Sequence, residues 1–575
     1  MPMTVNGTED VALEWDAINW RLHEDNVGRL RCRIFKAAQE QDLAKVRSLQ
    51  KMMLRSWSNT LVSVRQVTQR NAGRKTAGID GEIALSSPAR MALAVRVHSS
   101  ARTWNPLPVK RVYVPKANAK LRPLGIPVIM DRCHQNRAKN ALEPEWEARF
   151  EARSYGFRPG RSCQDAIEAV YDTCTGQTAA RIWALDADLA AAFDRLDHSH
   201  LMSAIGSFPG REMIRAWLKA GVFEPGKGFA PTEEGSPQGG VISPCLLNVA
   251  LHGLEGAAGV RYGPDGIRTA TGSPVLVRYC DDFVVCCHTR QQAEQVKAQL
   301  AEWLAPRGLA FNDEKTKIVS LEAGYDFLGF SIRRYRNGKL LIKPSKAAVR
   351  RVKRKLAEQM RRLRGQNASA VLAAICPITR GWASFYRSVV SKKTFASLDD
   401  YLWKLTCKWA CRSHPGKPGH WVTRRYFGQF NRSRRNMWVF GDAASGAYLP
   451  PLAWTPIIRH RKVTGRASPD DPALASYWNQ RRGRNQPPLD RSTLRLLKVQ
   501  HGRCALCADL LLHADREPHT PGEWQQWHRT TRKAITRQLI TARGQGMPDG
   551  TRLVHTHCQR RATGTGSQEP ASSRT

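Results

Sequence analysis

Residues 279–282 read Tyr-Cys-Asp-Asp, and their two adjacent carboxylates lie between two apolar runs. The first run is Val-Leu-Val at 275–277, and the second is Phe-Val-Val-Cys-Cys at 283–287. Both are β-branched or aromatic in character, which predicts two buried strands joined by a tight polar turn. Such a hairpin holds Asp281 and Asp282 at its tip, where their oxygens suit a hard cation such as Mg²⁺. A solvated Asp-Asp turn is the alternative if the pair stands alone.

A second carboxylate motif, at residues 182–194, favours the metal site. There an apolar strand leads into acidic residues and then into a predicted helix. If Asp188 at the strand end lies beside the hairpin carboxylates, the three complete a site for two metal ions. In such a site one ion activates an attacking 3′-hydroxyl and the other stabilises a leaving pyrophosphate. For Asp186, Asp194 and Asp197, helix capping or surface solvation is the preferred interpretation.

These motifs resemble the palm of a reverse transcriptase, and five further blocks extend the resemblance in the family's order. Residues 116–127 are similar to the family's fingers segment, and residues 154–162 to the block that follows it. Residues 235–244 are similar to the template-and-nucleotide-binding turn, and residues 314–317 and 325–330 to the last two blocks. Further stretches narrow the resemblance to bacterial group II intron-encoded proteins, which are reverse transcriptases and maturases. They occupy residues 15–20, 49–54, 76–81, 381–387 and 402–404.

The resemblance implies an α+β, right-hand polymerase fold with fingers, palm and a helical thumb. It also implies a helical N-terminal extension and a small C-terminal domain that is zinc-binding or HNH-like. We expect an N-terminal extension (1–90), fingers and palm (91–342), a thumb or maturase X domain (343–450), a basic DNA-binding linker region (451–495), a degenerate HNH-like or zinc-binding domain (496–562) and a disordered tail (563–575).

Roles for the site residues also follow from the resemblance. Asp188 and Asp281 would be the principal ligands of two Mg²⁺ ions, with Asp282 as an accessory ligand. The residues expected to bind the nucleotide are Lys120, Arg122, Phe193, Gln238 and Lys315. Among them Arg122 and Lys120 would hold the triphosphate, since a guanidinium fork suits phosphate oxygens. Lys315 would protonate or neutralise the leaving pyrophosphate. Cys280 departs from the alanine more usual at its place.

Phe193 follows Asp188 by five residues, where the family places a ring beneath the incoming sugar. A ring at that place would clash with a 2′-hydroxyl and so favour deoxynucleotides. A core aromatic would look the same in the sequence, so this role depends on the resemblance.

The charge of the chain indicates a polyanionic partner. With 90 Lys and Arg against 49 Asp and Glu, the formal charge is +41, which points to nucleic acid. Residues 346–364 carry apolar positions at helical spacing and many cations on the other faces, which favours RNA or template-primer contact over a merely solvated helix. A membrane surface is the rival partner, but we find no run near the roughly 20 apolar residues of a spanning helix. The scattered cysteines and the lack of a signal-peptide core predict a cytoplasmic protein with reduced thiols.

The C-terminal region carries a separate candidate metal site. Cys504 and Cys507 have the spacing of a metal knuckle, and His555 and Cys558 could supply the remaining ligands of a structural Zn²⁺. The family often ends in an HNH endonuclease built in this way. Its central Asp-His or His-His, which activates water, has no clear counterpart apart from a degenerate trace at residues 517–521, so we expect endonuclease activity to be lost. Ordinary buried thiols are the alternative.

Two classes of function therefore compete. In the first, the protein is an RNA-directed DNA polymerase that also acts as a maturase in group II intron splicing and mobility. Its partners would be intron RNA, an RNA template with a DNA primer, dNTPs and target DNA, and no membrane. In the second, it is a non-catalytic RNA-binding splicing factor that retains the polymerase fold. The intact carboxylates and the fingers Arg122 favour the first. A ribonucleotide-using polymerase is a third option, which Phe193 opposes.

Overall fold

The computed structural model describes residues 14–101, 103–115, 121–176, 180–236, 239–264, 269–484, 489, 491–507, 511–512, 518, 520–540 and 550–562. The chain divides into two compact units, and each is discontinuous in sequence. The first unit comprises the chain up to Pro159 together with Trp183–Ile318 and Val463–Trp478. The second unit comprises Gly160–Ile182, Val319–Lys462 and the chain from Asn479 onward.

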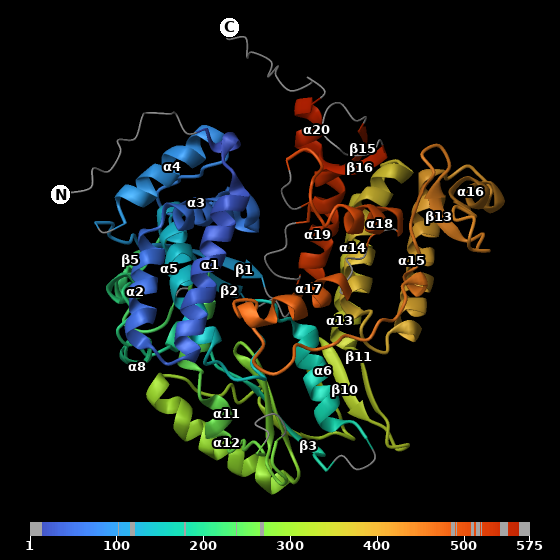
Figure 1. Ribbon diagram of the computed structural model, residues 1–575. Helices are drawn as coiled ribbons and strands as arrows, with labels where there is room; N and C mark the ends of the chain where they lie inside the picture. The colour runs from blue at the N-terminus through green and yellow to red at the C-terminus, as the bar shows by residue number, and fades with distance from the viewer. Residues whose placement is uncertain are drawn as a thin grey trace. The chain divides into compact units, whose positions relative to one another are not determined.

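The first unit begins with a layer of helices, as the apolar spacing near the N-terminus predicts (Figure 1). These are α1 (Trp20–Gln39), α2 (Leu43–Arg55), α3 (Trp57–Arg65) and α4 (Ser87–Ser99), which pack with α5 (Ile129–Glu147). Each of the first four begins after a capping residue whose side chain accepts a backbone N–H, which satisfies a donor that the helix leaves open. The caps are Asn19, Asp42, Ser56 and Ser86.

A partly buried arginine of α1 ties this layer to a distant segment. The Arg31 guanidinium donates from Nη2 to Glu143 Oε2 at 2.9 Å and to Asp470 Oδ2 at 2.7 Å, and from Nε to Asp470 Oδ1 at 2.8 Å. Asp470 lies in the predicted linker region, where Ser468 and Trp478 are also buried. This part of the linker is therefore packed structure and not a solvated connection.

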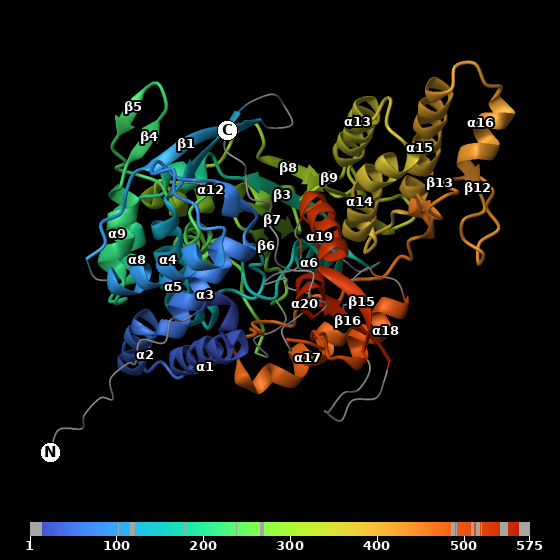
Figure 2. The ribbon, with the colours of Figure 1, turned by 90° about the horizontal axis from the view of Figure 1, so that it is seen from above.

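Two sheets complete the first unit. The first is a four-stranded sheet of order β6-β7-β3-β8. Its strands are β6 (Val275–Tyr279), β7 (Asp282–Cys287), β3 (Trp183–Asp188) and β8 (Lys317–Ser320). The pairs β6–β7 and β3–β7 are antiparallel, and α12 (Arg290–Leu304) packs on β3 and β7. A second sheet of order β2-β1-β4-β5 projects at one edge in Figure 2, with β1 (Val109–Pro115), β2 (Leu121–Ile126), β4 (Val222–Glu224) and β5 (Gly228–Ala230).

Shorter helices of the first unit connect these sheets. They are α7 (Ala192–Arg195), α8 (His198–Ile205), α9 (Arg211–Lys219), α10 (Ser243–Ala250) and α11 (Leu254–Ala257). Asp197 caps α8 by accepting the backbone N–H of His200 at 2.6 Å, which is the capping role expected for it. The apolar residues of this region share one core cluster with the palm strands and with α1 and α2.

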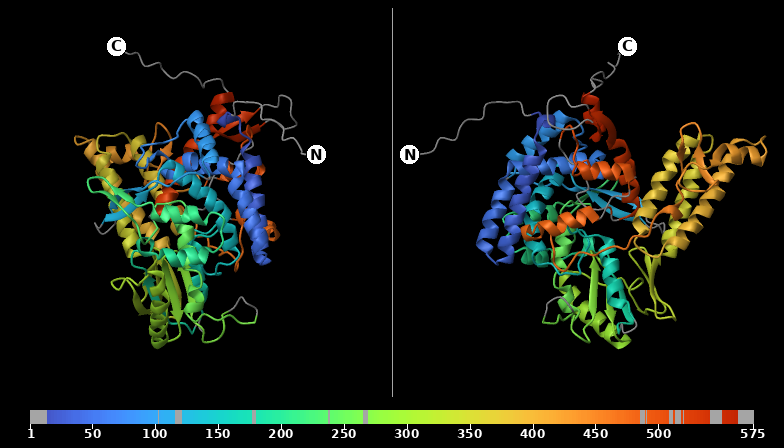
Figure 3. Two further views of the ribbon diagram at one scale, coloured as in Figure 1. Left: turned by 90° about the vertical axis from the view of Figure 1, so that its left-hand side faces the viewer. Right: turned by 45° about the vertical axis from the view of Figure 1, so that its right-hand side comes forward.

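The second unit contains a bundle of helices and small sheets (Figure 3). Its helices are α6 (Cys163–Cys174), α13 (Lys346–Arg362), α14 (Ala368–Tyr386), α15 (Lys392–Ser413) and α16 (Gly419–Tyr426). The sheets are β9 (Tyr325–Phe327), β10 (Phe330–Arg334) and β11 (Leu340–Pro344), and β12 (Phe427–Gly428), β13 (Val439–Asp442) and β14 (Ala447–Tyr448). The basic helix predicted at 346–364 is thus present as α13, with Val352, Leu356 and Met360 buried.

The C-terminal part of the second unit adds further elements. They are α18 (Arg491–Val499), α19 (Pro521–Ala534), β15 (Ile535–Ile540), β16 (Gly550–His555) and α20 (Thr556–Ala562), and the helix α17 (Ala475–Arg484) leads into them. A small apolar cluster that includes Leu497, Leu553 and Val554 joins α18 to the β15–β16 hairpin. The predicted tail lies outside the described residues.

By length and composition, α14 is the one helix in the described ranges that could cross a membrane, although the sequence was expected to contain none. About three-quarters of it (72%) is buried within the protein. Burial of this extent is what the central helix of a helical bundle requires, so its apolar character has a structural cause.

Candidate active site

Strand pairing brings the three predicted carboxylates together. Asp188 at the end of β3 is the direct partner of Asp282 at the start of β7, and Asp282 is also the partner of Tyr279 on β6. Asp281 occupies the turn of the same hairpin. The side chain of Asp188 remains 22% exposed, so the cluster is reachable from solvent.

The electrostatics of the cluster favour a bound cation. Burial and then the negative charges of Asp281 and Asp188 raise the pKa of Asp282 well above its usual value. Three carboxylates this close repel one another, and divalent cations with oxygen preference relieve that repulsion. The three half-buried carboxylates therefore form a donor set that fits Mg²⁺.

A buried polar network supports the turn from below. Arg278 donates from Nη1 to Asn248 Oδ1 at 2.9 Å and to the carbonyl of Cys280 at 3.3 Å, and Asn248 Nδ2 donates to the carbonyl of Gly156 at 2.8 Å. Cys280 itself adopts a left-handed backbone with φ +63°, which costs a residue other than glycine about 1 kcal/mol or more. Sequence reasoning missed this network, although a charged residue between the apolar Val277 and Tyr279 in a buried strand is a signal for one.

Gly156 approaches the turn so closely that only glycine fits. A Cβ at this position would lie 2.3 Å from the backbone N of Cys280. We therefore expect Gly156→Ala to displace the turn and to lower kcat for nucleotide addition by at least about 10-fold, because small misplacements of catalytic groups are costly. Primer extension over a range of nucleotide concentrations measures the effect.

The matched control for that variant is Gly28→Ala in α1, where a Cβ meets no atom within 4 Å. It should keep the wild-type rate. Equal rates for the two variants would contradict the close approach of Gly156 to the catalytic turn.

Lys315 lies against one of the candidate metal ligands. Its Nζ is 2.7 Å from Oδ2 of Asp188, and both residues belong to the first unit. The ammonium therefore neutralises Asp188 in this structure. To act on a leaving pyrophosphate, as predicted, Lys315 would exchange this carboxylate for a phosphate oxygen.

The predicted nucleotide-binding residues are only partly described. Arg122 is exposed on β2, directly opposite Val114 of β1. Lys120 and Gln238 lie outside the described residues. Phe193 is 7% exposed and belongs to the main core cluster, so its role beneath the sugar stays a prediction.

The turn around Gln238 is anchored on both sides by described residues. The carbonyl of Phe193 accepts the backbone N–H of Ser236 at 2.5 Å. Gly239 has φ +124°, and a Cβ there would lie 2.5 Å from the carbonyl oxygen of Gly125 on β2. The turn is therefore in direct contact with the strand that carries Arg122.

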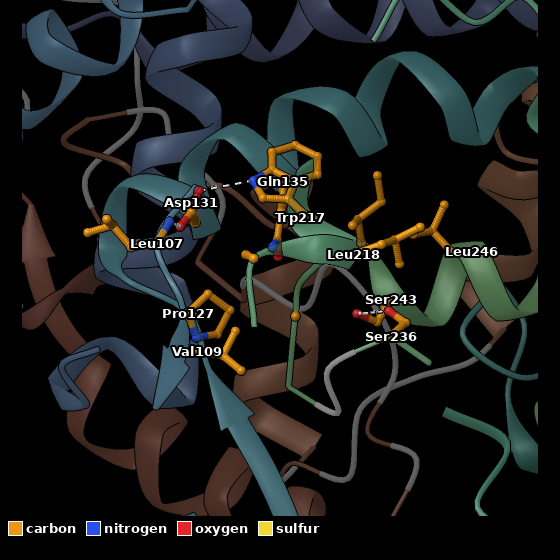
Figure 4. A pocket seen from close by; sticks show the side chains of 13 residues that line it. Leu107, Val109, Pro127, Asp131, Gln135, Trp217, Leu218, Ser236, Ser243 and Leu246 are labelled. Carbon is orange, nitrogen blue, oxygen red and sulfur yellow. Dashed lines mark hydrogen bonds between the residues drawn. The ribbon is translucent and has the colours of Figure 1, made fainter. Parts of the chain in front are cut away.

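A small pocket lies beneath this turn (Figure 4). In it Asp131 accepts a hydrogen bond from Trp217 Nε1 at 3.0 Å, and Ser236 Oγ donates to Ser243 Oγ at 2.8 Å. Gln135 Oε1 also accepts the backbone N–H of Val241 at 2.8 Å. These polar groups are satisfied by one another, and their hydrogen bonds hold the turn in place. None of the three carboxylates lines this pocket.

A second cluster in the second unit contains the predicted zinc ligands. The ligand atoms of Cys504, Cys507, His555 and Cys558 all lie within 4.8 Å of one another. His555 Nδ1 is 3.4 Å from the thiol of Cys507 and 3.8 Å from that of Cys558, and its backbone N–H donates to Cys504 Sγ at 3.5 Å. Three thiols and an imidazole match the ligand number and type of a structural zinc site.

Comparisons with known proteins place the chain in a family. The family described as reverse transcriptase (RNA-dependent DNA polymerase) matches residues 114–332, the N-terminal domain of reverse transcriptase matches 15–97, and the group II intron maturase-specific domain matches 349–427. Protein YkfC of Escherichia coli (strain K12) is 34% identical over 310 residues, which are 48% of this chain and 81% of that protein. The chain belongs to the group II intron-encoded reverse transcriptases and maturases.

The similarity to other members of this reverse transcriptase/maturase family is more partial. The group II intron-encoded protein LtrA of Lactococcus lactis subsp. cremoris is 29% identical over 295 residues, which are 41% of this chain and 48% of LtrA. The match thus spans about half the length of LtrA. Among solved structures, telomerase from Candida albicans with a fragment of telomeric RNA aligns over 56% of this chain and 63% of that one, at 13% identity and a TM-score of 0.33.

Proposed function

We propose that the protein is an RNA-directed DNA polymerase that also acts as a maturase for group II intron RNA. The observation that carries the polymerase activity is the register that sets Asp188 opposite Asp282 and beside Asp281. A splicing factor without catalysis would be free to lose these carboxylates, whose mutual repulsion otherwise only costs stability. The maturase-specific match at residues 349–427 supports the second activity.

The mechanism follows from what each side chain can do. Asp188 and Asp281 would hold two Mg²⁺ ions, which would supply activation of the primer 3′-hydroxyl and neutralisation of the leaving pyrophosphate. Arg122 on β2 would bind the triphosphate with its planar fork. Lys315, which pairs with Asp188, would protonate or neutralise the leaving pyrophosphate. The network under Cys280 keeps the carboxylates in position.

The substrates we propose are deoxynucleotides on an RNA template with a DNA primer, with intron RNA and target DNA as partners. Support for the nucleic-acid partners comes from the formal charge of +41 and from the basic faces of α13. A membrane partner is not proposed, because the apolar helix α14 is mostly buried in the second unit. We propose a cytoplasmic location, as the sequence predicts.

Primer extension on an RNA template with Mg²⁺ tests the polymerase, with deoxynucleotides and ribonucleotides compared. Wild type should extend with deoxynucleotides. Phe193→Val should raise ribonucleotide use by about 10-fold or more, because it removes the ring that would clash with the 2′-hydroxyl, and a difference of one methylene in a pocket is already worth about 1–3 kcal/mol. Leu196→Val, a truncation of another buried side chain after the same strand, is the control and should leave the sugar preference unchanged.

The alternative function makes the opposite prediction. A non-catalytic splicing factor would bind RNA tightly and with strong salt dependence but would extend no primer. Splicing of an intron RNA in the presence of purified protein, measured beside primer extension, separates the two activities.

We also propose that the four clustered ligands in the second unit hold a structural Zn²⁺. Support comes from the convergence of four suitable ligand atoms from two stretches of the chain about 50 residues apart, 504–507 and 555–558. Cleavage of target DNA is not proposed, since the general base of an HNH site has no clear counterpart in the sequence.

A further inference from the structure

The C-terminal helix α19 packs along the apolar helix α14, and Figure 1 shows the two side by side. At the crossing point α14 carries Gly381. A Cβ there would lie 2.5 Å from the backbone N of Gln525 and 3.0 Å from the carbonyl oxygen of Pro521. The two helix backbones are therefore in direct contact, which requires glycine and buries α14 against α19.

Polar contacts fix the register of this packing. Ser384 of α14 and His528 of α19 are both buried, and Ser384 Oγ is 3.2 Å from His528 Nε2. Lys355 of α13 donates from Nζ to Oε1 of the buried Gln525 at 2.6 Å. A slip of α19 by one turn would leave Ser384, Gln525 and His528 buried without these partners, which disfavours any other register.

The same helix leads directly into the candidate zinc site. α19 ends at Ala534 and β15 begins at Ile535, which is the direct partner of the ligand His555 on β16. Cys558 follows on α20, and Cys504 and Cys507 follow α18. The residue directly after α19 is therefore paired across the strands with a candidate zinc ligand.

We propose that the zinc-bound C-terminal segment is a structural part of the thumb, in which the metal holds α19 against α14. The proposal rests on the zinc site proposed above. In this arrangement the C-terminal segment stabilises the bundle that carries the maturase-specific match. The apolar face of α14 is complete only when α19 covers it.

Hydrogen exchange in the full chain tests the coupling, together with the zinc content of each purified variant. Wild type should contain zinc, and Cys504→Ser combined with Cys558→Ser should remove it. The amides of residues 368–386 should then exchange at least about 10-fold faster, because local protection follows the free energy of local opening. The control is Cys407→Ser combined with Cys411→Ser on α15, which removes two thiols outside the cluster and should change neither readout.

A second variant tests the helix contact without touching the ligands. Gly381→Ala should stabilise α14 slightly by helix propensity alone, so faster exchange in residues 521–534 with zinc retained would point to the clash with Gln525. Unchanged protection of α19 in this variant would overturn the packing.

The outcomes separate the two proposals. Loss of zinc without any change in α14 would overturn the coupling while the zinc site stands. A wild-type chain that binds no zinc would overturn both the zinc site and its role, whereas the Gly381→Ala result would still report on the packing itself.

Discussion

Asp281→Asn should reduce single-turnover nucleotide incorporation by more than about 100-fold. Removing even a group that only hydrogen-bonds a metal ligand commonly lowers metal affinity or activity by about 10–100-fold, and Asp281 would bind the metal directly. Asparagine keeps the shape of the turn but removes a charge from the group formed with Asp188 and Asp282. Because those charges repel one another, the variant should unfold at the same temperature as wild type or a higher one. A loss of rate without a loss of stability is therefore the signature of a metal ligand.

The measurement is incorporation rate over a Mg²⁺ titration, with thermal unfolding of the same preparations. Asp25→Asn is the matched control, since Asp25 is an exposed carboxylate that pairs only with Arg21 at 3.8 Å among the described contacts. It should behave as wild type. A wild-type rate for Asp281→Asn at any Mg²⁺ concentration would remove Asp281 from the catalytic site.

The second large effect concerns stability. Glu147→Gln should lower the free energy of unfolding by about 3–5 kcal/mol, because it leaves a buried charge without its partner. Arg158 and Glu147 have side-chain exposures of 1% and 0%, and two hydrogen bonds of 2.9 Å join them. Arg158 also donates to the carbonyls of Glu151 and Ser154 at 2.8 Å, so it cannot turn to solvent.

Glu294→Gln is the matched control, because it removes the same charge from an ion pair that is exposed and not buried. The distance from Glu294 Oε1 to Arg290 Nε is 3.0 Å, close to that in the buried pair. The side chains of Arg290 and Glu294, however, are 67% and 53% exposed. Exposed pairs contribute about 0–1 kcal/mol, so this variant should unfold close to wild type. Equal unfolding midpoints for the two variants would show that the Arg158–Glu147 pair is less buried than described.

The catalytic hairpin could be predicted from the sequence because its signals are local. Apolar runs on both sides of residues 279–282 form β6 and β7, and the run before Asp188 forms β3. Membership of the reverse transcriptase and maturase family was also predicted and is confirmed by the comparisons. Four candidate zinc ligands, chosen by residue type and spacing, do converge.

Contacts between distant segments could not be predicted from local patterns. The Lys315–Asp188 pair joins residues 127 positions apart, and the position of Gly156 under Cys280 depends on the packing of the whole palm. The contact of α19 with α14 leaves no periodic signal beyond an ordinary amphipathic helix. The roles of Phe193, Lys120 and Gln238 stay predictions, and so do the contiguous domain boundaries.

The contact between Arg31 and Asp470 has a consequence for synthesis on the ribosome. Its partner Asp470 follows it by 439 positions, so α1 emerges with a cation whose second carboxylate does not yet exist. Domains generally fold in order from the N-terminus as they are made, but the first unit receives its last segment only after most of the second unit has been translated. A nascent or truncated chain that stops before residue 463 therefore carries an incomplete first unit, and the polymerase matures late in its own translation.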